Sequence, residues 1–552
     1  MYSDDEDSSG DEPPVREYPA GNAEDDVNDA DLTDEQLRYL LGFRPREFIL
    51  YGNSLLTQFK GKDDRMECRD SYGEEFWRNY VPKWEHLPDL VIEQIFSYLS
   101  IPDKHAASQV CRNWYRTFHL PNCWRQFLLD DRTLTKRKYT RYLGYIRELD
   151  HYRMQLCLQK VAPFWQAIHV KPMSNLMNLF NFVTLAAHYS KSQRERRDVE
   201  VFANLHIFEF CFSPDHLQQG TERHDNHVYG TGGQLLRGVV DLLRELNSLR
   251  HLILTNLLLE KALEATSLLD EVVANCMLTL QTLSIVNLTR APVTFLHPGA
   301  FLNLRVLKMS PQNLHGDTLI AIAESCRYLN EIYLVHNQYT EIGMMLPAKN
   351  WIEFNKLNPR IRVKLIFQGR SKRDLIWQER CPVDSVVFDS QLKPLTAESA
   401  IIMTSLYAPT LENLIYLGLP RFHQPHRFSD RCDSSLVLLV RQCAQLKRLV
   451  IREVISTCTL LLIAFHGQQT GMKLLVVRKN AIRQKFDFPM SPEWSSEFSH
   501  WLKKSSTNFE TCFAEIRQLL GDPLWRPLTD KEFTRLPDYG SLLHCDQLNY
   551  NF

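Results

Sequence analysis

The chain has 552 residues, of which 44% are apolar and 24% are charged, a globular composition with room for two to four domains. The formal net charge of −2 is unevenly spread, because residues 1–36 hold 14 acidic residues against one basic residue, Arg16, and the other 516 residues therefore carry +11. A surplus this thin over so long a body argues against a nucleic-acid binder and is compatible with an acidic partner.

Thirteen cysteines are scattered along the chain without a CxxC pair, which predicts reduced thiols. No apolar region typical of a signal peptide follows the first residues. The longest apolar runs, such as residues 460–465, fall far short of the roughly 18 residues of a membrane helix. We therefore expect a soluble protein of the cytoplasm, the nucleus or both, without a membrane partner.

Residues 1–36 are expected to be a disordered acidic tail, because such a charged segment buries too little apolar area to offset the entropy of ordering its backbone. Aromatic and leucine residues return over residues 37–83, which predicts a short structured lead-in to the next domain.

Residues 84–130 are predicted to form three short helices; positions 87–124 read LPDLVIEQIFSYLSIPDKHAASQVCRNWYRTFHLPNCW. Pro88 and Asp89 suit the first turn of a helix, where an N–H is not needed and a carboxylate meets the positive end of the dipole. Pro102 is expected to end this helix, and Asp103 to cap the second one. Apolar residues at helical spacing mark the first and third helices: Ile92, Ile95, Phe96 and Leu99, then Val110, Cys111, Trp114, Tyr115 and Phe118, closed by Trp124.

Three short helices cannot enclose this much apolar surface, so the following domain, another protein or both must cover it. The order of residues, from Leu-Pro through Ile-Phe-Ser-Tyr-Leu and Val-Cys-Arg-x-Trp to the final Trp, resembles the F-box. That resemblance implies docking on the adaptor Skp1 through Leu87, Pro88, Ile92, Ile95, Phe96, Leu99, Val110, Cys111, Trp114 and Trp124, some of which must be internal core. Lys104 and His105 stand where the family usually has a leucine after the aspartate. An ordinary three-helix piece of a larger domain is the alternative.

Residues 131–490 show a recurrent apolar-x-x-apolar-x-apolar triplet, which is weak evidence by itself in a chain so rich in apolar residues. Amphipathic helices are predicted between triplets, at 234–246, 259–277, 317–328 and 434–445. Strands and helices alternating every 24–32 residues predict an irregular leucine-rich-repeat solenoid with a concave parallel sheet. The triplets begin at Trp165, Leu205, Leu249, Leu280, Leu304, Leu329, Val383, Leu414, Leu446 and Met472, with a weak unit at 360–367. A plain βα domain is the alternative.

The longest loops are predicted at 213–233, 338–359 and 420–433, and such loops commonly carry binding specificity. Residues 491–552 are expected to hold a capping helix that starts near Ser491 and Pro492, presents Phe509, Phe513, Ile516 and Leu520 on one face and ends at Gly521. The remaining tail, with three prolines, is expected to be irregular.

The sequence predicts no catalytic residue, no metal ligand and no cofactor. The HxxH pairs at His224/His227 and His423/His426 lie in predicted loops without a third ligand at a fixed spacing, so exposed histidines are the simpler interpretation. Gly230 to Gly233 precede a helix but lack the third glycine and the lysine of the nucleotide-binding loops.

The F-box and the long repeat region together resemble the F-box only proteins with degenerate leucine-rich repeats. The resemblance implies a non-catalytic substrate receptor that joins Skp1, and through it a cullin/RING ligase core, while the repeats hold an unidentified protein target for ubiquitination. The alternative is a scaffold that binds Skp1 without a cullin. A nucleic-acid-binding repeat protein would also be a candidate, but the charge count argues against it.

Overall fold

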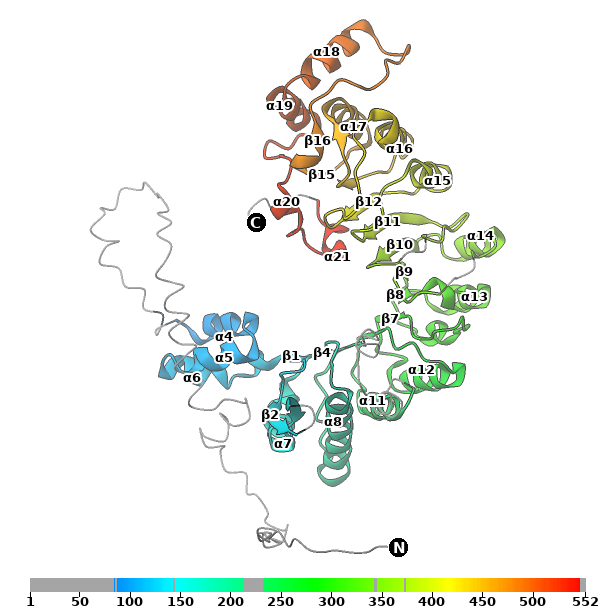
Figure 1. Cartoon of the computed structure of the whole chain (residues 1–552). Coiled ribbons are helices and arrows are strands. Elements are labelled where there is room, and N and C mark those ends of the chain that lie inside the picture. Colours follow the sequence, from blue (N-terminus) through cyan, green and yellow to red (C-terminus); the bar gives the residue numbers. More distant parts are fainter. Residues whose placement is uncertain are drawn as a thin grey trace, which may run out of the picture. The chain divides into compact units, whose positions relative to one another are not determined.

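The structure is a computed structural model that describes residue 84 and residues 87–141, 144–212, 232–341, 345–371 and 374–546 (Figure 1). These residues belong to one compact unit, Asp63–Phe552, and the second unit, Met1–Lys62, lies outside them. The predicted acidic tail over 1–36 and the predicted lead-in over 37–83 therefore also lie outside the described residues.

The first described elements are three short helices and a 3-10 turn: α4 (Asp89–Tyr98), α5 (Ile101–Ser108), α6 (Arg112–Phe118) and η2 (Pro121–Trp124). The break between the first two helices lies between Tyr98 and Ile101, about one turn before the position predicted at Pro102. Pro102 lies in the first turn of α5, and Ser100, rather than Asp103, is the N-cap, since its side chain accepts from the Asp103 backbone N–H. A proline is tolerated at the start of a helix because the first N–H groups have no partner inside it.

Within the described part of the chain, twelve parallel strands then form one sheet in the order β1-β4-β5-β6-β7-β8-β9-β10-β11-β12-β13-β15. Each strand of this sheet pairs with the sheet's next strand in chain order, so the sheet grows by one strand per repeat, as in a solenoid. The predicted fold class, an α/β chain with an N-terminal helical domain and a repeat solenoid, is confirmed. The strands are β1 (Gln126–Leu129), β4 (Ala167–Val170), β5 (Ile207–Cys211), β6 (His251–Thr255), β7 (Thr282–Val286), β8 (Val306–Met309), β9 (Glu331–His336), β10 (Arg362–Gln368), β11 (Val383–Asp389), β12 (Asn413–Leu417), β13 (Arg448–Ile451) and β15 (Leu474–Val477).

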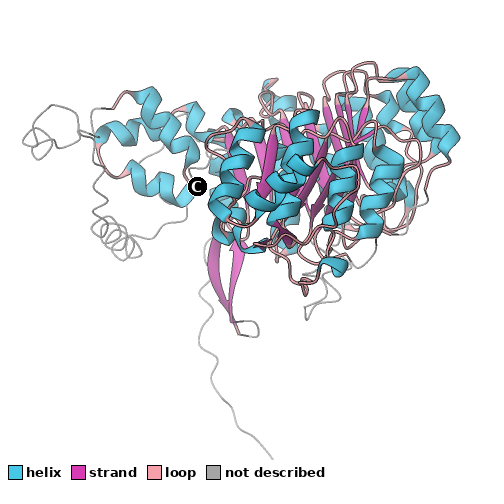
Figure 2. Ribbon diagram, turned by 90° about the horizontal axis from the view of Figure 1, so that it is seen from above, coloured by secondary structure: helices cyan, strands magenta, loops and turns pink. Residues whose placement is uncertain are grey.

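Helices cover the outer side of the sheet and the strands line its inner, concave side (Figures 1 and 2). The triplet side chains of the strands point outward and form the core against these helices; Leu252, Leu283 and Leu307, for example, are fully buried. The helices are α7 (His151–Lys160), α8 (Leu176–Arg197), α11 (Gln234–Arg244), α12 (Ala262–Cys276), α13 (Gly316–Ser325), α14 (Ala348–Leu357), α15 (Ala397–Tyr407), α16 (Asp433–Gln442) and α17 (Thr457–Thr470).

Two repeats differ from the predicted pattern. The triplet predicted to begin at Leu414 begins three residues earlier in the structure. Leu414 pairs with Val386 and Tyr416 with Phe388, so the core triplet of this strand is Leu411, Leu414 and Tyr416. Leu417 instead faces the concave side. The loop predicted at 338–359 contains α14, whose Trp351 and Phe354 are buried.

Two small strand pairs lie outside the main sheet. The antiparallel hairpin β2 (Thr135–Thr140) and β3 (Gly144–Leu149) projects beyond the helices in Figure 2, and the sequence analysis did not predict it. The second pair is formed by β14 (Ile455–Ser456) and β16 (Ile482–Arg483) near the end of the solenoid.

The end of the chain caps the solenoid and then returns over its concave face. Helices α18 (Ser496–Ser506) and α19 (Phe509–Leu520) pack on α17, and Gly521 ends α19 in the left-handed conformation, as predicted. The cap has two helices rather than one, its first helix begins at Ser496 rather than near Pro492, and Phe509 is exposed. The tail expected to be irregular contains α20 (Asp530–Phe533) and α21 (Tyr539–Leu542). Both lie on the inner side of the sheet, opposite the main helices (Figure 1).

Candidate protein-docking surface

The N-terminal helices have a small aromatic core of their own. Phe96 meets the rings of Trp114 and Phe118 edge-on, at 5.8 and 6.4 Å, and Phe118 meets Trp124 at 5.2 Å. Such edge-to-face pairs add stabilisation beyond the burial of their area. Of the ten positions predicted to bind a partner, Ile92, Phe96 and Trp124 are buried in this core. They hold the helices together rather than present an open surface.

The other seven predicted positions retain access to solvent. Val110 is 63% exposed and Pro88 is also exposed. Five positions are half-buried: Leu87, Ile95, Leu99, Cys111 and Trp114. This division separates the predicted set into members that shape the domain and members that could touch a partner.

Helix α4 carries a second apolar stripe that the sequence analysis did not single out. Val91 and Tyr98 are 43% and 81% exposed, and with the half-buried Ile95 they follow the i, i+4, i+7 spacing of one helix face. Leu90, beside them, is 76% exposed. The signal was present in the sequence, because these apolar residues are out of phase with the buried Ile92 and Phe96. Apolar side chains on both sides of a short surface helix are typical of a helix that another surface covers.

Polar contacts hold the start of α4 against α6. The Asn113 side chain donates to the Leu87 carbonyl at 3.0 Å, and Trp114 Nε1 donates to the Trp84 carbonyl at 3.0 Å. Arg116 forms an ion pair with Asp89 at 2.8 Å. The Leu-Pro start of the stretch therefore has a defined position on the helices that follow.

Lys104 occupies a buried position of α5, where only 3% of it is exposed. Its Nζ donates to the Cys123 carbonyl at 2.5 Å and lies 5.5 Å from the centre of the Trp124 ring. Burial lowers the pKa of this amino group. The lysine thus has a hydrogen-bond acceptor and an aromatic face inside the domain, and both contacts link α5 to η2.

Comparison with known families decides what this domain is. Residues 84–126 match the F-box domain. The chain carries an F-box domain. Its end at residue 126 coincides with the start of β1, so the F-box passes directly into the first strand of the solenoid.

Proteins that resemble this chain also combine an F-box with repeats. F-box/LRR-repeat protein 21 of Bos taurus is 38% identical over 66 residues, which are 12% of this chain and 15% of that protein. The Mus musculus protein of the same name is 52% identical over 44 residues, which are 8% of this chain and 10% of that protein. The matched regions are therefore a small part of the length of these relatives.

The concave face of the solenoid is the second surface that could bind a protein, and part of it is covered. Residues 522–546, called here the C-terminal segment, place Leu528, Phe533, Leu542 and Leu543 against concave side chains. Those side chains belong to successive strands: Val335, Ile366, Val387, Ile415, Val450 and Val476. Since the C-terminal segment occupies these strands, a target would meet the concave face itself over the strands that precede them.

Polar groups gather on that earlier part of the concave face. His169 Nδ1 lies 2.7 Å from Glu209 Oε2 across β4 and β5, and this hydrogen bond lowers the pKa of Glu209. At the border with the covered strands, Lys308 on β8 lies 4.8 Å from the ring of Tyr333, which belongs to the cluster under the C-terminal segment. These side chains could form hydrogen bonds and ion pairs with a polar protein surface.

The residues described here contain no group of three or more histidine, cysteine or acidic side chains placed to hold a metal ion. His423 and His426 lie in the predicted loop with their rings 6.1 Å apart, and Arg483 contacts His426 at 3.2 Å; His224 and His227 are outside the described residues. The twelve described cysteines form no disulfide with one another. Within the described ranges, no helix is both long and apolar enough to span a membrane.

Proposed function

We propose that this chain is the substrate-recognition subunit of a Skp1–cullin–F-box ubiquitin ligase. The F-box domain at residues 84–126, followed directly by a twelve-stranded repeat solenoid, is the observation that supports this proposal. The F-box would bind Skp1 and, through it, the cullin/RING core, while the solenoid would bind a protein target. Such a receptor works in the cytoplasm or the nucleus.

The proposed contribution to ubiquitination is proximity. A receptor that holds the target beside a charged conjugating enzyme raises its effective concentration and needs no catalytic residue of its own. The positive charge of the body beyond residue 36 favours an acidic target. No cofactor is required for this role.

The Skp1 contact is assigned to the accessible members of the predicted set, together with the second stripe of α4. Leu87, Pro88 and Val110 are accessible on the F-box, and Val91, Ile95 and Tyr98 extend that apolar surface. The aromatic core behind them supports this surface without touching the partner.

Replacement of Leu87 and Pro88 by alanine tests the assignment. Both positions are accessible, so the F-box should remain folded while the apolar contact area is lost. We expect Skp1 co-purification with the full chain to fall by more than about tenfold, since buried apolar contacts at the centre of an interface carry most of its energy. A matched control is Tyr139→Ala with Tyr145→Ala on the projecting hairpin, where the side chains are 66% and 79% exposed.

The control should bind Skp1 as the unaltered chain does. Persistence of Skp1 binding after Ile95→Ala and Val110→Ala are added to the first pair would show that the docking surface is assigned wrongly. Target binding should persist in all these variants, because they leave the solenoid unchanged.

A scaffold that binds Skp1 without a cullin is the second candidate. The F-box supports it equally, since the adaptor contact is common to both functions. Co-purification distinguishes them: a Skp1 complex of the full chain that contains no cullin would favour the scaffold, and one that contains it would favour the ligase receptor.

A further inference from the structure

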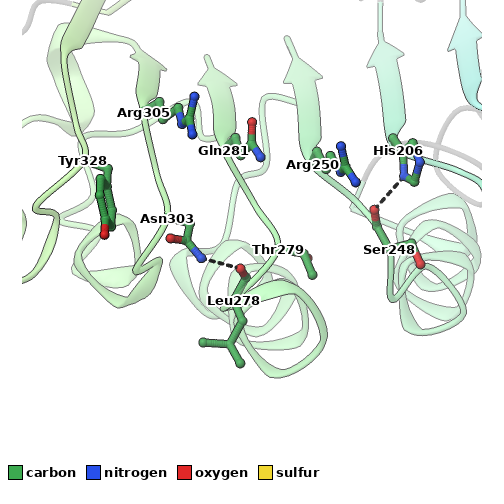
Figure 3. Close-up of a pocket in the computed structure, with 9 residues that line it drawn as sticks. All are labelled: His206, Ser248, Arg250, Leu278, Thr279, Gln281, Asn303, Arg305 and Tyr328. Atoms are coloured by element: carbon green, nitrogen blue, oxygen red, sulfur yellow. Dashed lines mark hydrogen bonds between the residues drawn. The ribbon is translucent and has the colours of Figure 1, made fainter.

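One polar residue precedes each of four successive strands, and together these residues form a row along the edge of the sheet where the strands begin. They are His206, Arg250, Gln281 and Arg305, before β5, β6, β7 and β8 (Figure 3). A backbone ladder fixes the row: the N–H of Arg250 donates to His206 at 2.8 Å, that of Gln281 to Arg250 at 2.7 Å, and that of Arg305 to Gln281 at 2.8 Å.

A second row lies beside the first and completes a groove of about 670 Å³. Ser248, Thr279 and Asn303 each stand two residues before a member of the edge ladder, and Tyr328 stands two residues before the next rung, which precedes β9, so the solenoid repeat builds both walls. Asn303 Nδ2 donates to the Leu278 carbonyl at 2.7 Å, and the Ser248 carbonyl accepts from His206 Nδ1 at 3.2 Å (Figure 3). Tyr328, 60% exposed, offers an aromatic surface at one end.

The positive charge of this groove is not neutralised by the described protein. Among the described residues that line it, none is acidic, and no described carboxylate forms an ion pair with Arg250 or Arg305. The same ladder positions in later repeats are neutralised: Lys447 pairs with Glu412 at 2.8 Å, and Lys473 with Asp546 at 2.7 Å. Arg478, which follows β15, is likewise paired with Asp530 at 2.9 Å.

We propose that this groove binds an extended, phosphorylated segment of the target protein, with the phosphate held between Arg250 and Arg305. The proposal rests on the proposed function, and it names the class of target and the place of recognition. The groove, from His206 beside β5 to Tyr328 beside β9, spans roughly 19 Å at the usual spacing of neighbouring strands, which fits about six extended residues.

The spacing of the two arginines favours phosphate over a carboxylate. Arg250 and Arg305 are two strands apart, about 10 Å between backbones, so their side chains can converge from opposite sides above Gln281. A single guanidinium saturates both oxygens of a carboxylate, whereas a phosphate dianion has three oxygens and can accept from two forks at once. Gln281 supplies an amide donor between them.

The experiment measures binding of the full chain, purified with Skp1, to an oriented library of fluorescent peptides with a central phosphoserine or phosphothreonine. Matched libraries carry unphosphorylated serine or glutamate at that position, and a single-stranded oligoribonucleotide is a further probe. We expect binding to the phosphorylated library only. The variant Arg250→Gln with Arg305→Gln should weaken it by about tenfold or more, since two charge-assisted contacts are lost.

The matched control is Arg196→Gln with Arg237→Gln, which removes the same charge from exposed positions of α8 and α11. It should bind the phosphorylated library as the unaltered chain does. Equal binding of the glutamate or unphosphorylated library would overturn the proposal. So would unchanged binding by the variant lacking Arg250 and Arg305, or tighter, arginine-dependent binding of the oligoribonucleotide.

Failure of this proposal is separable from failure of the proposed function. The variant lacking both groove arginines should still co-purify with Skp1, because the F-box is unchanged. Conversely, a chain that does not bind Skp1 can still be assayed against the peptide libraries by itself.

Discussion

His336 is a buried titratable residue at the end of β9, with 4% of its surface exposed and no described hydrogen-bond partner for Nε2. Burial disfavours the charged ring and lowers its pKa to about 4. A histidine with a depressed pKa binds its proton more readily in the unfolded chain. Its contribution to stability is therefore complete above pH 6.5 and is lost as the pH falls toward 4.

We expect the free energy of unfolding to fall by up to about 3 kcal/mol through His336 between pH 6.5 and 4, because one pKa unit corresponds to about 1.4 kcal/mol. Replacement of His336 by leucine should remove this part of the acid sensitivity. Urea denaturation of both proteins at pH 7 and pH 4.5 measures it. The exposed His423, replaced by leucine, is the control and should change nothing; equal acid sensitivity in the native and His336→Leu chains would contradict the assignment.

At the scale of elements, the prediction was poorest for the C-terminal segment, which was expected to be irregular and contains α20 and α21. Its short helices make few contacts with each other and take their position from the concave face, where Phe533 and Leu542 are buried against strand side chains. Trp525 Nε1 donates to the Leu475 carbonyl at 2.8 Å, and Arg448 donates to the Cys545 carbonyl at 2.7 Å. These contacts join residues far apart in the sequence, so no local sequence pattern predicts where the segment lies.

Truncation after Gly521 should expose the apolar concave side chains that the C-terminal segment covers. We expect the truncated chain to self-associate and to unfold at lower temperature, because an uncovered apolar patch of this kind favours association. Truncation after Asp546 is the control, since it leaves every described contact of the segment in place. Size-exclusion chromatography and thermal denaturation measure the difference. A monomeric truncated chain with unchanged thermal stability would show that the segment does not stabilise the solenoid.

At the scale of the whole molecule, the F-box and the solenoid have separate cores. Phe96, Phe118 and Trp124 pack on each other, whereas the first repeats are centred on the stack of Phe127 with Trp165 at 4.3 Å. The chain passes from one core to the other where η2 leads into β1, and η2 also contacts η3 (Ala162–Phe164). Damage to one core is therefore expected to leave the other core folded.

Replacement of Phe96 by alanine should destabilise the F-box by about 3–5 kcal/mol, the usual cost of removing a buried phenylalanine. Skp1 binding should be lost while the main thermal transition of the solenoid stays in place. Phe208, fully buried in the solenoid, provides the reciprocal variant. Its replacement by alanine should lower the main transition and preserve Skp1 binding. Calorimetry measures the thermal transition, and co-purification measures Skp1 binding. If either variant both lowered the main transition and lost Skp1 binding, the two cores would not be independent.

Much of the repeat architecture could be predicted because its signal is local. The triplets that begin at Leu249, Leu280 and Leu304 mark β6, β7 and β8, and the apolar stripes before and after the first triplet mark α11 and α12. The register was missed at Leu414, where several overlapping apolar residues allow two triplets and only pairing with β11 decides between them. The projecting hairpin was missed because residues 135–140 contain few apolar residues with the alternation of a buried strand.

The sequence alone determined that the chain carries an F-box-like stretch and a solenoid of strands and helices, since both depend on the spacing of apolar residues along the chain. Tertiary structure decided which F-box residues are core and which remain accessible. Ile92 and Ile95 fit the same apolar spacing in the sequence, but only Ile92 is fully buried. It also decided that the C-terminal segment covers the later concave strands and that Arg250 and Arg305 line one groove. These properties depend on residues that are distant in sequence and become neighbours only when the repeats stack.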